Sequence, residues 1–136
     1  MGARTYRTVL IGAGNVASFL KENIISPFEV LAVGGRSRSH PIPKDADIYI
    51  ISVSDKAISA VAEELKDVNG LVVHTAGSVP MDVLPQTRRG VLYPLQTITK
   101  GRKLTPSHVP FYIEANREHD LVLLRTLAET MGSSAM

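Results

Sequence analysis

The sequence contains no cysteine and no tryptophan, and aromatic residues make up only 5% of its 136 residues. Without cysteine the chain forms no disulfide, offers no thiolate to a metal ion and has no cysteine nucleophile. The scarcity of aromatic side chains argues against the stacking platforms that bind single-stranded nucleic acids. A functional site in this chain must therefore be built from backbone groups, hydroxyls and charged side chains.

Long runs of one residue type are also missing. The 15 basic and 13 acidic residues are spread along the chain, so no basic block indicates a nucleic-acid or membrane partner. No apolar run reaches the length of a membrane span, and no signal-peptide core follows the first residues. A hydrophobic content of 44% over this length is typical of one globular domain. We therefore expect a cytoplasmic protein of bacterial type.

Two kinds of apolar segment alternate along the chain. Short aliphatic runs predict strands, and apolar residues at helical spacing predict helices. Such alternation implies right-handed crossovers between parallel strands, so the expected fold class is α/β with a doubly wound, mostly parallel sheet. We predict strands at residues 8–11, 28–34, 46–53, 71–75, 90–94 and 109–114, and helices at 15–23, after 54, near 81–84 and after 116.

Polar residues and a glycine stand at the expected ends of two helices. Ser54 and Asn116 precede apolar helical patterns, where a side-chain oxygen can cap the first free N–H groups. Gly132 follows the last apolar residue of the final pattern, where glycine commonly ends a helix. These positions predict where the second and the last helix begin and where the last one ends.

A glycine-rich turn joins the first strand to the first helix. The pattern is Gly12-x-Gly14-x-x-Ala17, directly after an aliphatic run. Gly12 permits a tight turn, Gly14 permits close approach of backbone N–H groups to a pyrophosphate, and a small residue at position 17 permits close packing of the helix. A purely structural turn is the alternative. The pattern predicts a Rossmann-like nucleotide-binding domain over residues 1–136, with cofactor contacts at Gly12, Ala13, Gly14, Asn15 and Val16.

Basic residues follow the second strand. A Rossmann domain that binds NAD commonly has an acidic residue at this place, whereas one that binds NADP has arginine. Here the sequence reads Gly35-Arg36-Ser37-Arg38, and the one nearby acid, Glu29, lies at the other end of the strand. Arginine can grip a 2′-phosphate in bidentate fashion, so we predict NADP as the cofactor, held by all four residues. The alternative is that the two arginines are solvated loop charges; FAD is disfavoured by the same basic loop.

Two further loops follow strands whose carboxyl ends would face a ligand. The loop 52–54 follows the third strand, and its backbone would pass beneath the adenine-side ribose and phosphates; the loop 75–78 follows the fourth strand and would lie near the nicotinamide. Cofactor contacts are predicted at Ser52, Val53, Ser54, Thr75 and Ala76. His74 could act as an acid or base, although a structural role is the stronger interpretation. No spacing predicts a metal site, since His40, His108 and His119 are scattered, and catalytic residues stay unassigned.

Three sequence segments carry a resemblance to a known family. They are residues 9–17, the segment Val72-Val-His-Thr-Ala-Gly-Ser78 and the segment Gly90-Val-Leu-Tyr-Pro-Leu-Gln-Thr97. In these segments the chain resembles uncharacterised bacterial proteins classed as NADP oxidoreductases, which are similar to pyrroline-5-carboxylate reductases and deazaflavin-dependent NADP oxidoreductases. The resemblance implies a Rossmann-like domain followed by a helical domain that supplies dimer contacts and much of the substrate pocket. Because the sequence ends at Met136, we expect the helical domain to be absent here and the homodimer to belong to a longer form.

The leading functional hypothesis is the cofactor-binding domain of an NADP-dependent oxidoreductase. Its reaction would be hydride transfer to or from an unknown small substrate, with the cofactor supplying the chemistry and the protein binding and orienting it. A non-catalytic module that binds a dinucleotide or a protein partner is the alternative.

Overall fold

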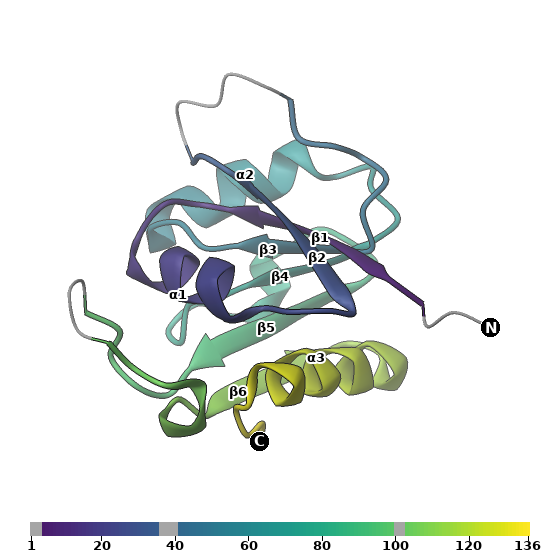
Figure 1. Cartoon of the computed structure of the whole chain (residues 1–136). Coiled ribbons are helices and arrows are strands. Elements are labelled where there is room, and N and C mark those ends of the chain that lie inside the picture. Colours follow the sequence, from purple (N-terminus) through teal and green to yellow (C-terminus); the bar gives the residue numbers. More distant parts are fainter. Residues whose placement is uncertain (1–3, 36–40, 100–102) are drawn as a thin grey trace.

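A six-stranded sheet forms the centre of the computed structural model, which describes residues 4–35, 41–99 and 103–136 (Figure 1). The strands lie in the order β2-β1-β3-β4-β5-β6. The first five of these are parallel, as the alternating segments predict. The strands are β1 (Tyr6–Ile11), β2 (Phe28–Val33), β3 (Ile48–Ile51), β4 (Leu71–His74), β5 (Arg89–Pro94) and β6 (Phe111–Ala115).

Helices cover both faces of this sheet, so the predicted doubly wound α/β fold is confirmed. The helices α1 (Asn15–Asn23) and α3 (Glu118–Met131) pack on one face, and α2 (Ile58–Glu64) packs on the other. Every residue of β3 and β4 is buried, which explains why these strands are continuous apolar runs in the sequence. The observed strands differ from the predicted bounds by no more than two residues, whereas the helix predicted to begin after residue 54 begins at Ile58.

The strand β6 is the exception to the parallel order, because it runs antiparallel to β5. A parallel neighbour needs a crossover connection, usually a helix. The described part of the connection from β5 to β6 contains only the short 3-10 turn η3 (Pro106–His108). The chain therefore reverses direction here and closes one side of the sheet with an antiparallel pair.

The two predicted side-chain caps are wrong. Ser54 precedes the 3-10 turn η1 (Asp55–Ala57) that leads into α2, and its side chain makes no capping hydrogen bond. Asn116 joins the beginning of β5, where its side chain accepts from the Arg89 N–H at 3.0 Å and donates to the Thr87 carbonyl at 2.7 Å. The predicted end of α3 is confirmed, since Gly132 adopts a left-handed conformation with φ of 96°.

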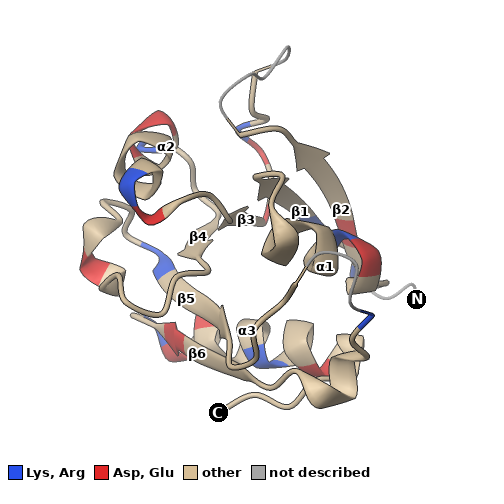
Figure 2. Ribbon diagram, turned by 90° about the vertical axis from the view of Figure 1, so that its left-hand side faces the viewer, with Lys and Arg blue, Asp and Glu red and all other residues tan. Residues whose placement is uncertain are grey.

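The order of the strands positions a crevice at the carboxyl edge of the sheet. The chain leaves β1 toward one face to form α1, and it leaves the adjacent β3 toward the opposite face to form α2. Neighbouring connections that diverge in this way leave an opening between them, where ligands of α/β proteins bind. Acidic and basic residues are both spread over the elements around this crevice (Figure 2).

Candidate functional site

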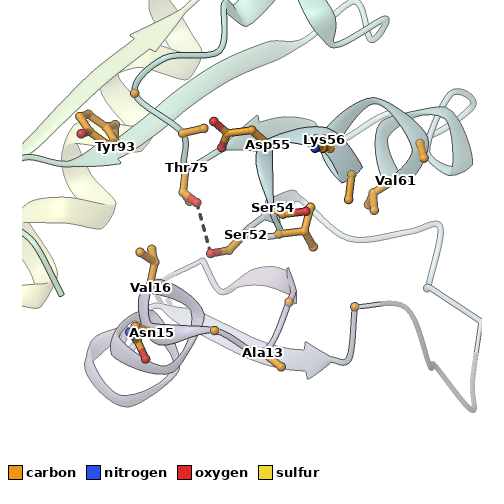
Figure 3. A pocket seen from close by; sticks show the side chains of 18 of the residues that line it. Ala13, Asn15, Val16, Ser52, Ser54, Asp55, Lys56, Val61, Thr75 and Tyr93 are labelled. Atoms are coloured by element: carbon orange, nitrogen blue, oxygen red, sulfur yellow. Dashed lines mark hydrogen bonds between the residues drawn. The ribbon is translucent and has the colours of Figure 1, made fainter. Parts of the chain in front are cut away.

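A pocket of about 890 Å³ occupies this crevice. Loops that follow β1, β2, β3 and β4 line it, together with Tyr93 from β5, the first turn of α1, and residues of α2 as far as its last residue, Glu64. Figure 3 shows the side chains of most of its lining residues. The site is thus built at the strand ends where the glycine pattern predicts it.

Gly12 forms the floor of the pocket. Its backbone has φ of 138°, a conformation that side chains with a Cβ rarely adopt, and a Cβ would overlap the carbonyl oxygen of Ser52. The Ser52 N–H donates to the Ile11 carbonyl at 2.8 Å, and the Gly12 N–H donates to the Val33 carbonyl at 3.1 Å. A glycine is therefore required here by the close approach of the loops after β1 and β3.

Gly14 has a different environment. It is the N-cap residue of α1, with ordinary extended dihedral angles, and a Cβ built on it would meet no atom within 4 Å. No side chain caps α1, and its first turn contains no acidic residue. The free N–H groups and the helix dipole therefore give this end of the pocket a positive potential, which suits a phosphate group.

The opposite wall comes from the loops after β3 and β4. The Thr75 hydroxyl donates to the Ser52 hydroxyl at 3.2 Å (Figure 3). The Ser78 hydroxyl donates to Asp55 Oδ2 at 3.1 Å. These two hydrogen bonds join the loops at two points, so the wall has a fixed shape.

The pocket brings together every predicted cofactor residue that the structure describes. These are Gly12, Ala13, Gly14, Asn15, Val16, Gly35, Ser52, Val53, Ser54, Thr75 and Ala76. The predicted 2′-phosphate residues Arg36, Ser37 and Arg38 lie outside the described residues. In the sequence these three residues directly follow Gly35, which lines the pocket.

Several lining residues were not predicted from the sequence. They are Asp55, Lys56, Ala57, Ala60, Val61, Glu64 and Tyr93, whereas Gly77 belongs to the loop predicted to lie near the nicotinamide. The first two could have been found from their position directly after the predicted loop 52–54. Tyr93 reaches the pocket because β5 lies beside β4, an arrangement that the sequence pattern does not specify. Gly77 packs so closely on the Tyr93 ring that a Cβ would overlap it, a contact that depends on the tertiary fold.

His74 has a structural environment. It is completely buried at the end of β4, and its Nδ1 accepts a hydrogen bond from the Ala76 N–H at 3.1 Å. That bond leaves Nε2 to carry the proton and donate to the Pro80 carbonyl at 3.3 Å. Burial lowers the pKa of the imidazole, which keeps it neutral. His74 therefore holds the loop after β4 in shape, as the structural interpretation predicts.

Among the residues that the structure describes, no three histidine, aspartate or glutamate side chains lie together in a way that could hold a metal ion. Within the same residues, no helix has the length and apolarity needed to cross a membrane.

The chain matches no protein-family model and no curated protein sequence. It is similar to the solved structure of a putative NADP oxidoreductase from Bacteroides fragilis, with a TM-score of 0.80 and 27% identity. That alignment covers 97% of this chain and 60% of the Bacteroides chain. The resemblance to NADP oxidoreductases is confirmed.

A second solved structure supports the fold alone. Protein TM1727 from Thermotoga maritima aligns with a TM-score of 0.77 and 17% identity, over 95% of this chain and 56% of that protein. The chain therefore spans about 60% or less of the length of the solved structures that it resembles. The Rossmann-like α/β architecture extends over almost all of the sequence.

Proposed function

We propose that this chain is the cofactor-binding domain of an NADP-dependent oxidoreductase, with residues 1–136 forming one nucleotide-binding unit. The observation that carries the proposal is the open space above Gly14 at the uncapped beginning of α1. Among the described residues no atom packs there, although Gly12 two residues earlier is tightly enclosed. A pyrophosphate would fill that space and accept hydrogen bonds from the N–H groups of the helix.

The residues around the pocket fit the rest of a dinucleotide. Gly35 lines the pocket at the β2 end, so the adenosine half belongs on this side, with Arg36, Ser37 and Arg38 next along the chain to bind the 2′-phosphate. In this proposal the loop containing Ser52 passes beneath the adenine-side ribose and phosphates, and the loop containing Thr75 lines the side where the nicotinamide half belongs. When bound, NADP supplies hydride chemistry, and this chain holds and orients it.

The cofactor preference can be tested at Arg36. A charge-assisted hydrogen bond to phosphate contributes on the order of 1.5–3 kcal/mol, and solvent screening of an exposed arginine favours the lower value. We expect Arg36→Ala to weaken NADP⁺ binding about tenfold and to leave NAD⁺ binding nearly unchanged. Titration calorimetry with both dinucleotides measures this difference. Arg117→Ala is the matched control, because Arg117 lies at the opposite edge of the sheet, beside the beginning of β5.

The outcome separates three interpretations. Equal affinities of the wild type for NADP⁺ and NAD⁺ would mean that the basic loop does not select the cofactor. Absence of binding to both would refute the proposed function. Oxidation of NADPH with a panel of small carbonyl and imine substrates then distinguishes an oxidoreductase domain from a binding module. The proposal also includes a small-molecule substrate, whose identity is unknown, and assembly of the protein as a homodimer.

A further inference from the structure

One carboxylate lies at the end of the pocket opposite the beginning of α1. Asp55 begins the 3-10 turn after β3, and its Oδ2 accepts the Ser78 hydroxyl hydrogen at 3.1 Å. Figure 3 shows the Asp55 side chain extending toward the end of the pocket where Thr75 and Tyr93 lie. A carboxylate has about four acceptor positions, so the bond from Ser78 leaves Asp55 with further capacity to interact with a ligand.

The order of the strands determines which part of a dinucleotide reaches Asp55. With the adenosine half beside β2 and the pyrophosphate at the beginning of α1, beside β1, the remainder continues past β3 and β4 toward β5. The loops after β3 and β4 carry Asp55 and Ser78. This direction brings the nicotinamide half to the side of the pocket that contains the carboxylate.

The other charged groups in the pocket lie toward α2. Among the described lining residues, only Asp55, Lys56 and Glu64 are charged. Glu64 is the last residue of α2, and Lys56 lies on the α2 side of Asp55 in Figure 3. Of these three residues, Asp55 is the one with a hydrogen bond to the loop after β4, from the Ser78 hydroxyl.

We propose that Asp55 makes the pocket prefer oxidised NADP⁺ over reduced NADPH, an inference that rests on the proposed function. The oxidised nicotinamide ring carries a positive charge and the reduced ring is neutral. A nearby carboxylate attracts the charged ring and has little effect on the neutral one. The phosphates are the same in both forms, so the beginning of α1 does not distinguish them.

The ratio of the two dissociation constants tests this inference. Asp55→Asn removes the charge and retains an oxygen that can accept the Ser78 hydrogen bond. We expect the substitution to weaken NADP⁺ binding about twofold to fivefold, as for an exposed charge, and to leave NADPH binding nearly unchanged. The effect should decrease as ionic strength rises. Calorimetric titration with NADP⁺ and NADPH at two salt concentrations measures the ratio of the dissociation constants and its dependence on ionic strength. Asp55→Ser should give the same change in this ratio.

Glu64→Gln is the matched control, since it removes a carboxylate from the α2 end of the same pocket. We expect this control to leave the ratio of the two affinities unchanged. If Asp55→Asn changed the affinities for NADP⁺ and NADPH by the same factor, the inference would be overturned. It would also be overturned if Glu64→Gln shifted the ratio of the two affinities as much as Asp55→Asn does. Either result would leave the proposed function standing. A wild-type chain that binds neither form would refute the proposed function and this inference together.

Discussion

Replacing Gly14 by valine separates binding from folding. The N-cap position has φ of −81°, which valine adopts without strain, and a Cβ there meets no atom within 4 Å in the described part of the chain. The side chain would instead occupy the space above the first turn of α1, where the pyrophosphate must approach. Loss of one charge-assisted hydrogen bond costs on the order of 1.5–3 kcal/mol, so we expect NADP⁺ affinity to fall roughly tenfold to a hundredfold.

Gly12→Ala provides the contrast in the same loop. Its Cβ would overlap the Ser52 carbonyl oxygen, and φ of 138° is unfavourable for alanine, so strain alone should lower the free energy of unfolding by about 1–3 kcal/mol. Calorimetric titration and denaturant unfolding of both variants measure the two effects. A folded Gly14→Val protein with wild-type affinity would refute the phosphate site. A Gly12→Ala protein of wild-type stability would refute the close approach of the two loops.

Three substitutions test other contacts. Asp120 is fully buried and accepts two hydrogen bonds from Arg88, so Asp120→Asn should lower the free energy of unfolding by about 3 kcal/mol in denaturant titrations. His74 has a lowered folded pKa, hence the unfolded chain binds more protons and the wild type should lose stability as pH falls below about 6.5. His74→Asn should remove that pH dependence, as measured by melting between pH 8 and 5. Gly77→Ala should displace the Tyr93 ring, detectable as a change in tyrosine fluorescence.

Local signals explain why the glycine turn could be predicted. The strand that precedes Gly12, the turn itself and the beginning of α1 are adjacent in the sequence, so their pattern describes one continuous structure. The position of Gly132 at the end of α3 is also local, since a left-handed residue ends the helix directly. The parallel direction of most strands could also be predicted, because helical segments between strands imply crossover connections between parallel neighbours.

Contacts between distant segments could not be predicted in the same way. Asparagine commonly caps helices, yet the Asn116 side chain binds the backbone at Thr87 and Arg89, 27 or more residues away in the sequence. The role of Asp55 depends on Ser78, which lies 23 residues further on. Tyr93 reaches the pocket only because β5 lies beside β4. Each of these roles depends on which strands become neighbours.

The two glycines of the turn connect the position of the pocket to the fold of the sheet. Gly12 allows the loops after β1 and β3 to touch at the Ser52 carbonyl, which closes the floor of the crevice. The segments that follow these two loops diverge to opposite faces of the sheet, toward α1 and α2, so the space above that floor stays open. Gly14 lies at the edge of this space and adds no side chain to it. Glycine thus allows close packing at position 12 and leaves space open at position 14. Only the surrounding atoms distinguish the two roles.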